Sequence, residues 1–413
     1  MLSFRLPEIA SITRLFTSLW SSGVYQRPLN TLDLPPQCVL ANPLLYNVMG
    51  DGATFRQDAF QEHFNPTNNR APFFQVFHPA FLDVVGPSPS LRVIASIPGS
   101  VFAHEAPVWL PETDEVFFSS NCSGPSGLFD CSANNKISKI SMKDVRSAIA
   151  ASDTLAAPIN VTVTQLQLPE SIQMTWGSTG PYRSSLLFFN SGSGVKPASL
   201  AIVNPAPPHN VTILVDNYFG RQFNSLNDGK IHPKSGKIFF TDVTYGFLKG
   251  FKPAPLLPNQ GYRFDPDTGH IRVVADGLKR PNGLAFSPDG NIAYIGDTAA
   301  AAGFLGRNQT DPATIYAFDV DPHSQVFLNR RVFAYIDAGV PDGIQVDSKG
   351  NIYSACGDGV HIWDHDGTLI GKFFLGSVSA NMIFADKGEL VILANDTVYF
   401  AQIAAQGVKV AFA

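Results

Sequence analysis

Five stretches of this chain share one layout, and that repeat restricts the possible folds more than any other feature of the sequence. Each stretch begins with a polar residue, followed by a short strand-like run, a turn and a second strand-like run. The five opening residues are Glu105, Asn227, Asn282, Asp342 and Asn381. A sixth, weaker copy starts near Met174 and has its turn at residues 182–184. Six copies, spaced roughly 40 to 70 residues apart, predict an all-β, six-bladed β-propeller.

The opening polar residue keeps its place within the repeat. The first four lie 10 or 11 residues before the aliphatic residue that opens the second strand, and Asn381 lies 9 residues before its own. In a propeller the first strand of every blade lines the central channel, so residues at one repeat position converge on one axis. An open sandwich or a set of unrelated hairpins would require no such phase. We therefore expect all five residues to face the channel.

Four of these residues form a set of oxygen donors, namely Glu105, Asn227, Asn282 and Asp342. Two carboxylates and two amides, with no Cys or His cluster, are typical ligands of a hard divalent cation. Calcium fits best because it accepts about six to eight oxygen ligands in flexible geometry, which leaves room for water and substrate. A single Asn-Gly or Asp-Gly pair is more often a turn, but four in phase favour one Ca²⁺ on the propeller axis.

The composition is compatible with this fold and excludes some other functions. Only 15% of the residues are charged, whereas 34 Gly, 31 Pro and 32 Phe suit short aromatic-rich strands joined by tight turns. A net charge of -5 without a basic run gives no surface for nucleic acid. No uncharged apolar run reaches the roughly 18 residues of a membrane span. We expect neither a nucleic-acid nor a membrane partner.

The first part of the chain differs from the rest. Residues 1–90 show no sustained periodicity, so we expect an irregular N-terminal extension wrapped on a propeller domain of residues 91–413. The apolar run at residues 91–97 precedes the first repeat, and the last repeat lacks a strand. Propellers commonly complete one blade with strands from both ends of the domain. We therefore predict that residues 91–97 pair with the C-terminal strands.

Cysteines and sequons bear on the cellular compartment. Cys122 and Cys131 flank a turn-rich loop, which favours a local disulfide, while the pairing of Cys38 with Cys356 stays open. Five N-glycosylation sequons are present, at Asn121, Asn160, Asn210, Asn308 and Asn395. Residues 1–23 are not a clean signal peptide, because charges interrupt the apolar run. On balance we expect a secreted, extracellular glycoprotein.

Several motifs in order resemble the SMP-30/gluconolactonase family, and within it the fungal lactonohydrolases. The likeness runs from about residue 91 to the end and rests on five stretches, which begin at His104 (His-Glu-Ala-Pro-Val-Trp), Asn227 (Asn-Asp-Gly), Phe240 (Phe-Thr-Asp-Val-Thr-Tyr-Gly-Phe), Pro281 (Pro-Asn-Gly) and Pro341 (Pro-Asp-Gly-Ile). The resemblance implies a calcium-dependent lactonase. Its metal ligands would fall on Glu105, Asn282 and Asp342, and Asn227 would bind metal or substrate.

One position departs from the family pattern. Members that act on sugar lactones often carry Arg two residues before the Asn-Asp-Gly asparagine, and this chain has Ser225 there. The departure leaves the recognition of substrate hydroxyls open. Other expected substrate-binding residues are Asn227, Asp242, Tyr245 and Asn381, although Asp242, Tyr245 and Asp297 could equally be turn or cap residues.

The expected chemistry follows from the metal. A cation would polarise a lactone carbonyl and stabilise the oxyanion as water attacks. Asp342 is our first candidate for the general base, alongside Glu105 as a catalytic ligand; His104 is the second candidate, although it should point away from the channel. No Gly-x-Ser-x-Gly elbow favours a serine hydrolase.

Two alternatives and one unknown remain. The same propeller could hydrolyse other esters or phosphotriesters, or it could be a non-catalytic binding propeller that calcium stabilises. Retention of all four ligands favours an enzyme that acts on a small-molecule lactone. The lactone and the oligomeric state stay open.

Overall fold

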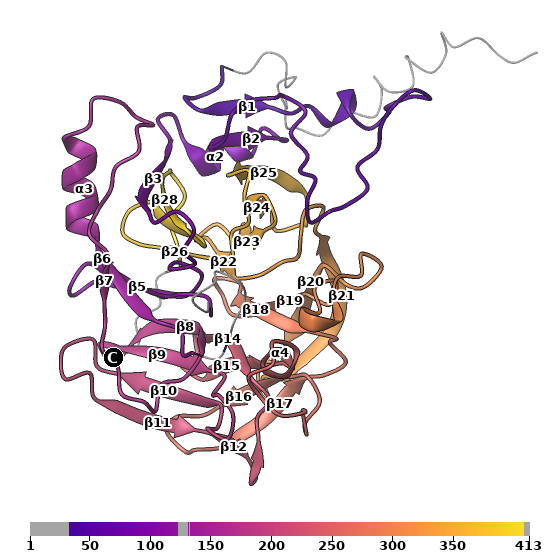
Figure 1. The fold of residues 1–413 in the computed structure, drawn as a ribbon. Coiled ribbons are helices and arrows are strands. Elements are labelled where there is room, and N and C mark those ends of the chain that lie inside the picture. Colours follow the sequence, from indigo (N-terminus) through magenta and orange to yellow (C-terminus); the bar gives the residue numbers. More distant parts are fainter. Residues whose placement is uncertain (1–32, 123–130, 132, 409–413) are drawn as a thin grey trace, which may run out of the picture. The chain divides into compact units, whose positions relative to one another are not determined.

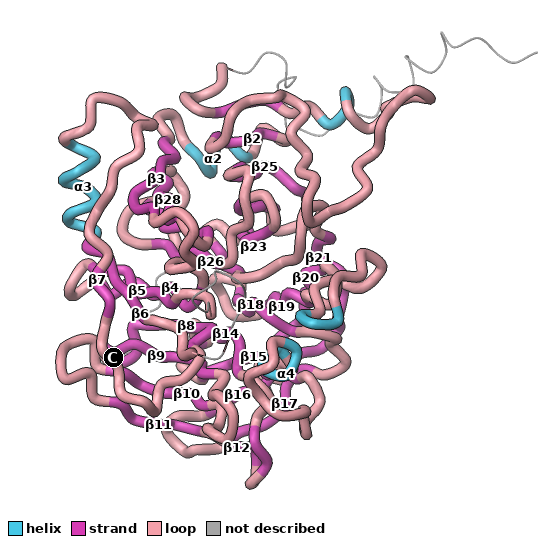
Figure 2. The backbone as a smooth tube through the Cα atoms, in the orientation of Figure 1, coloured by secondary structure: helices cyan, strands magenta, loops and turns pink. Residues whose placement is uncertain are grey.

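The computed structural model describes residues 33–122, 131 and 133–408. Within this part of the chain, six sheets follow one another round a ring, and the helices are few and short (Figures 1 and 2). Each blade contains four antiparallel strands that are consecutive in the chain, except that the last blade takes one from earlier in the chain, and two further strands extend the sheet of the fifth blade. The arrangement is the six-bladed β-propeller that the repeat predicted.

The strands of each blade run outward from the centre in chain order. The first blade contains β4 (Glu105–Leu110), β5 (Glu115–Ser119), β6 (Ile137–Ser141) and β7 (Thr164–Gln165). The second contains β8 (Thr175–Tyr182), β9 (Ser185–Asn190), β10 (Ser199–Val203) and β11 (Val211–Val215). The third contains β14 (Leu226–Ile231), β15 (Ile238–Asp242), β16 (Gln260–Phe264) and β17 (Ile271–Ala275).

The remaining blades follow the same order. The fourth contains β18 (Pro281–Phe286), β19 (Ile292–Asp297), β20 (Thr314–Val320) and β21 (Phe327–Tyr335). The fifth contains β22 (Ile344–Val346), β23 (Ile352–Cys356), β24 (Gly359–Trp363) and β25 (Leu369–Phe374). The sixth contains β26 (Asn381–Phe384), β27 (Glu389–Ala394), β28 (Thr397–Gln402) and β3 (Ser90–Ser96).

The innermost strands close the ring. β4 contacts β8, β8 contacts β14, and the succession continues through β18, β22 and β26 back to β4. Neighbouring sheets bury large side chains between them: the Phe239 ring of β15 lies 5.0 Å from the Phe286 ring of β18 and 5.6 Å from that of Phe327 in β21. Such pairs bury extensive apolar area, so the core is distributed between the blades rather than gathered at one centre.

The sixth blade confirms the predicted closure. β28 pairs antiparallel with β3, with Ala401 opposite Leu91 and Thr397 opposite Ser96. The outer strand of this blade therefore comes from before the first repeat, and its other three strands come from the last repeat. Backbone hydrogen bonds, rather than side-chain contacts alone, join the two ends of the ring.

The region before the propeller supplies two strands that the sequence did not predict. β2 (Phe73–Val76) pairs antiparallel with β25, and β1 (Cys38–Leu40) pairs parallel with β2. Both are too short to show a period, and they cover the edge of the fifth blade that would otherwise be unpaired. The division of the chain at residues 90 and 91 stays a prediction, and residues 1–32 lie outside the described part.

Short helices and one hairpin lie outside the blades. They are η3 (Pro43–Leu45), α2 (Phe81–Val85), α3 (Met142–Ala150), α4 (Tyr245–Leu248), η4 (Gly303–Leu305) and the hairpin of β12 (Asn217–Tyr218) with β13 (Arg221–Gln222). The longest described helix is far shorter and more polar than a segment that crosses a membrane.

A buried ion cluster lies in the fifth blade. The Lys372 Nζ donates to Asp337 Oδ1 at 2.8 Å and to Asp358 Oδ2 at 3.0 Å, and Asp358 also contacts His361 Nε2. Burial alone would raise the pKa of Asp358, but the charges of His361 and Lys372 outweigh it and hold this pKa well below its usual range. The cluster thus consists of compensated charges, and no sequence pattern predicted it.

Candidate metal centre

The predicted ligands lie at one end of the inner strands. Glu105 is the first residue of β4, Asn227 and Asn282 are the second residues of β14 and β18, and Asp342 lies just before β22. The Asp342 carboxylate lies beside the side chains of Glu105 and Asn282, both of which lower its pKa. Asp342 thus brings three of the four predicted ligands together. Asn227 occupies the equivalent place in β14, and its side chain makes no hydrogen bond with the described residues.

The glycines after these ligands are required by packing between blades rather than by turns. A Cβ on Gly283, which follows Asn282, would collide with the Asp342 carbonyl oxygen. A Cβ on Gly343, which follows Asp342, would collide with the side chain of Asn381. Each glycine therefore lets the next ligand-bearing strand approach closely. This close approach is what brings side chains from different blades into one site.

The two carboxylates form an electrostatically unfavourable pair that a cation would relieve. Glu105 is buried, and burial followed by the nearby Asp342 charge raises its pKa well above the usual range. Burial likewise raises the pKa of Asp342 to about 6, although the Lys249 charge opposes the shift. The Asp342 Oδ1 is buried and has no hydrogen-bond partner among the described residues. An oxygen-only donor set with one such free carboxylate oxygen fits a divalent cation.

The site relies on amides as well as carboxylates. The described residues contain no group of three or more His, Cys, Asp or Glu side chains placed to share a metal. Asn282 therefore supplies the third contact of the cluster. The Asn381 Nδ2 donates to Glu105 Oε2 at 2.8 Å, while its Oδ1 accepts from Met382 N at 2.8 Å. Asn381 therefore faces the channel and orients Glu105, and its contact with substrate stays a prediction.

A third carboxylate and a lysine lie deeper in the channel. Asp228 is buried, accepts a hydrogen bond from Leu284 N at 3.2 Å and acts electrostatically on both Glu105 and Asp342. Burial lowers the pKa of Lys230, and the Asp228 charge opposes this shift more than Glu105 does. Asp228 and Lys230 thus compensate each other beside the carboxylate pair.

The carboxylates of Asp242 and Asp297 bind the backbone of the segments that lead into the third and fourth blades. The Asp242 carboxylate accepts backbone hydrogen bonds from Asn224 at 3.0 Å and from Ser225 at 2.7 Å. Asp297 repeats the pattern one blade later, accepting from Lys279 at 2.8 Å and Arg280 at 2.9 Å. Both side chains are fully buried. This geometry favours the turn role that the sequence left open for both residues, and substrate contact by Asp242 stays a prediction.

His104 has the packing role that its position predicted. Its Nδ1 lies 2.8 Å from Asn395 Oδ1, and its ring meets the Trp176 ring edge-on at 5.8 Å. Burial, reinforced by the Lys249 charge, lowers the pKa of His104 to about 3. The imidazole is therefore neutral at ordinary pH and held between neighbours.

Two residues that the sequence did not single out, Trp176 and Lys249, border the carboxylate pair. The Lys249 Nζ lies 3.8 Å from the centre of the Trp176 ring and 5.9 Å from that of the Tyr245 ring. Burial lowers the pKa of Lys249 to about 8, opposed by the charges of Asp342 and Glu105. Trp176 is the second residue of β8 in the degenerate repeat, and Lys249 follows α4, so neither fell in phase with the ligands.

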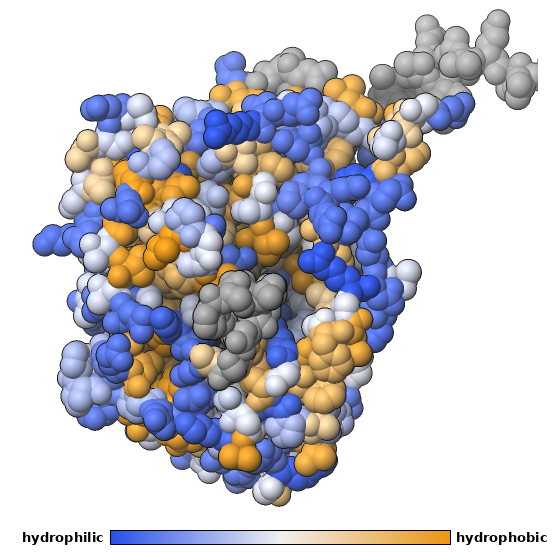
Figure 3. Space-filling model, viewed as in Figure 1, coloured by the Kyte–Doolittle hydropathy of each residue, from blue (hydrophilic) through white to orange (hydrophobic). Residues whose placement is uncertain are grey.

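Ser225 positions the segment that carries Lys249. Its Oγ accepts a hydrogen bond from Gly246 N of α4 at 2.8 Å, and the Tyr245 hydroxyl bonds to Thr298 of the next blade. Ser225, at the position where the family resemblance implied Arg, thus anchors a helix here. Beside it, Phe247 packs edge-on against Phe304 at 5.4 Å, and Figure 3 shows apolar surface over η4, where Phe304 is 62% exposed.

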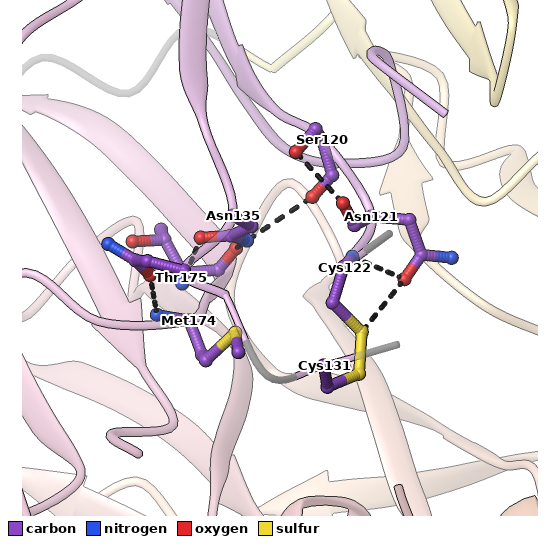
Figure 4. Close-up of a disulfide and its surroundings, with 8 residues drawn as sticks. Ser120, Asn121, Cys122, Cys131, Asn135, Met174 and Thr175 are labelled. Carbon is purple, nitrogen blue, oxygen red and sulfur yellow. Dashed lines mark hydrogen bonds between the residues drawn. A yellow bond between two sulfur atoms is a disulfide. The ribbon is translucent and has the colours of Figure 1, made fainter. Parts of the chain in front are cut away.

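The predicted disulfide between Cys122 and Cys131 is present, with a Cα–Cα distance of 4.8 Å (Figure 4). The loop that it closes, residues 123–130, lies outside the described residues. Both sulfurs pack in one cluster with Met174, Trp176 and Phe251, so the bridge supports the wall beside the carboxylates. Cys38 and Cys356 are free thiols.

A cavity of about 1180 Å³ opens at the opposite ends of the inner strands. Its lining includes Trp109, Lys230, Phe286 and Phe384 but none of the predicted metal ligands. The carboxylate pair therefore lies outside this cavity, towards the other mouth of the channel.

Known proteins resemble this chain in both sequence and fold. The sequence model of the SMP-30/Gluconolactonase/LRE-like region matches residues 104–395. The lactonohydrolase oryL of Aspergillus oryzae is 28% identical over 403 residues, covering 92% of this chain and 81% of the relative. A solved gluconolactonase from Xanthomonas campestris has a TM-score of 0.60 at 23% identity and covers 80% of this chain and 94% of its own. The calcium-binding regucalcin of Agrobacterium tumefaciens has a TM-score of 0.53 at 16% identity, with 76% and 96% covered.

Proposed function

This chain belongs to the SMP-30/gluconolactonase/LRE-like family, and on that premise we propose that it is a calcium-dependent lactonase that hydrolyses a lactone to its hydroxy acid. The observation that carries the proposal is the buried pair of carboxylates of Glu105 and Asp342, in which Asp342 Oδ1 has no hydrogen-bond partner among the described residues. Its similarity to the fungal lactonohydrolase over most of both chains supports the reaction class.

The residues that would hold the cation are Glu105, Asn227, Asn282 and Asp342. All present oxygen donors at one end of the inner strands, and the carboxylate pair supplies two negative charges against a divalent ion. Calcium is preferred because the set is all oxygen and because regucalcin, a calcium-binding protein, has the same fold. When bound, such an ion supplies a Lewis acid that polarises the lactone carbonyl and stabilises negative charge on its oxygen.

The residues of the chain then account for the proton transfers. Asp342 would accept a proton from the water that attacks the carbonyl carbon, through a carboxylate oxygen that does not bind the cation. Breaking the acyl C–O bond of the ring leaves an alkoxide, which takes up the proton that Asp342 accepted; this gives the hydroxyl of the product and restores the Asp342 carboxylate. Glu105 stays ionised against the cation and is held in place by Asn381.

The direct test is a panel of neutral lactones assayed by acid release. Protein freed of metal with a chelator is expected to be inactive, and calcium is expected to restore activity better than zinc or magnesium. Glu105→Gln, which keeps an oxygen donor but removes a charge, should need more calcium for half-maximal activity. Full activity in protein shown by elemental analysis to contain no metal would refute the proposal.

We also propose that the protein is exported to an oxidising compartment. The local disulfide supports this, as do the sequons at Asn160, Asn210 and Asn308, whose side chains are exposed. Asn121 is buried and bonded to its neighbours, so we expect no glycan there. Mass mapping of protein from its own cells, before and after glycosidase treatment, would check both points; free thiols at Cys122 and Cys131 would argue against export.

A further inference from the structure

The Lys249 ammonium is a charge for which the described residues provide no acceptor. It is half-buried, and no described residue accepts a hydrogen bond or forms an ion pair with its Nζ. One side of the ammonium faces the Trp176 ring at 3.8 Å, which stabilises the charge but satisfies none of its three N–H donors. A surface lysine would normally extend into water, so this placement calls for an explanation.

The position of Lys249 is fixed by several contacts. Gly246 N donates to Ser225 Oγ, Lys249 N donates to the Tyr245 carbonyl at 2.8 Å, and Tyr245 bonds to the next blade. A Cβ on Gly246 would collide with Ser225 Oγ, so α4 sits tightly on the start of β14. Hydrogen bonds and close packing thus hold the segment that carries the Lys249 ammonium in place.

Once a divalent cation is bound, the negative charges near Lys249 are compensated by other groups, and the charge of Lys249 is not. Glu105 and Asp342 neutralise the cation, and Asp228 compensates Lys230. Lys249, which in the absence of metal is attracted by Asp342 and Glu105, then keeps an uncompensated positive charge at the site. A half-buried charge of this kind attracts an anionic group far better than a neutral one.

We propose that Lys249 is a substrate-binding residue that selects lactones carrying a carboxylate close to the ring. The inference rests on the proposed lactonase function and names its substrate class. The carbonyl of such a lactone would lie on the metal side, its carboxylate would accept hydrogen bonds from the ammonium, and Trp176 would support the opposite face of Lys249. No bond is made or broken at Lys249, which acts through binding alone.

The test compares two lactones that differ in one group. One is γ-butyrolactone with a carboxylate on its γ-carbon, and the other carries a carboxamide at the same carbon. Assays with saturating calcium at about pH 6.5 keep both the ammonium and the substrate carboxylate charged. We expect the intact protein to prefer the carboxylate by about tenfold or more in kcat/KM, mainly through KM. Lys249→Met should abolish the preference, and Lys249→Arg should keep most of it.

A binding measurement separates recognition from turnover. Calorimetry with cyclopentanone carboxylate, a ring that water cannot open, should show a loss of about tenfold or more in affinity for Lys249→Met, with little change for the cyclopentanone carboxamide. Lys234→Met removes one positive charge from an exposed turn and should leave both preferences unchanged. An unchanged calcium affinity in Lys249→Met would show that its metal site is intact.

The outcomes distinguish this inference from the function on which it rests. Equal hydrolysis of the two lactones by the intact protein, or a preference that survives in Lys249→Met, would overturn the role of Lys249 and leave the lactonase proposal standing. Failure to hydrolyse any lactone with calcium present would overturn the lactonase proposal, and the calorimetric comparison would still decide whether Lys249 binds the carboxylate.

Discussion

Asn381 donates a hydrogen bond of 2.8 Å from Nδ2 to Oε2 of Glu105, so the sixth blade orients a carboxylate of the first. The bond joins residues 276 positions apart in the chain. Partners that orient a metal ligand commonly contribute as much to the site as some of the ligands themselves. The interface where the ring closes is therefore part of the metal centre.

Asn381→Ala should weaken calcium binding by about tenfold or more, because Glu105 loses the donor that fixes its orientation. Titration calorimetry of metal-stripped protein measures the change. Asn291→Ala, in an exposed turn, is the matched control and should leave calcium affinity unchanged. Equal affinities in the two variants would show that Glu105 is held by other contacts.

Asp342→Asn should reduce kcat by about a hundredfold or more while calcium affinity falls much less, because an amide keeps an oxygen donor but cannot accept the proton. Steady-state kinetics and calorimetry on one preparation separate the two effects. Asp366→Asn, on an exposed turn, serves as the control. Undiminished kcat in Asp342→Asn would remove this residue from the role of base.

Lys372→Met should cost about 3–5 kcal/mol of unfolding free energy, because it leaves Asp358 buried without its cationic partner. Urea denaturation measures the loss, and Lys349→Met, an exposed lysine of the same blade, should change little. A loss below about 1 kcal/mol would mean that His361 alone compensates Asp358.

The same cluster predicts how stability depends on pH. The pKa of Asp358 is lower in the folded protein than in the unfolded chain. Its contribution is therefore complete above the unfolded pKa, about 3.9, and disappears as the pH falls through the lower folded value. In Lys372→Met the folded pKa rises, so acid unfolding should begin at higher pH. Thermal midpoints measured from neutral to acid pH would show this shift, and superimposable profiles would contradict it.

A chain that ends after Thr397 should fail to fold cooperatively, because β28 and its pairing with β3 are lost. Calorimetry should show no sharp transition and no calcium-dependent stabilisation. A chain that ends at Val408 keeps every described strand and should behave like the full protein. A thermal midpoint preserved in the shorter chain would show that the ring closes without β28.

The sequence predicted the propeller and the predicted ligands because these residues occupy one position of a repeat. Every blade repeats the same backbone path, so residues at that position converge on the channel, as Glu105 at the start of β4 and Asn381 at the start of β26 do. Lys249 and Trp176 were not predicted, because neither occupies a recognisable position of the repeat. Their positions depend on α4, which belongs to one blade only, and on a degenerate repeat. β1 and β2 were missed because an exposed edge of another blade, not their own pattern, determines their structure.

The pairing of β3 with β28 also sets the order of events during synthesis. β3 leaves the ribosome early, yet its partner β28 is among the last segments made. About three hundred residues are therefore synthesised before this long-range pairing can form. Until then β3 has no partner strand, and Glu105 has no Asn381. A nascent chain would therefore bind calcium weakly, and tight binding would mark a finished molecule. We therefore expect calcium to stabilise only chains that have reached their last blade.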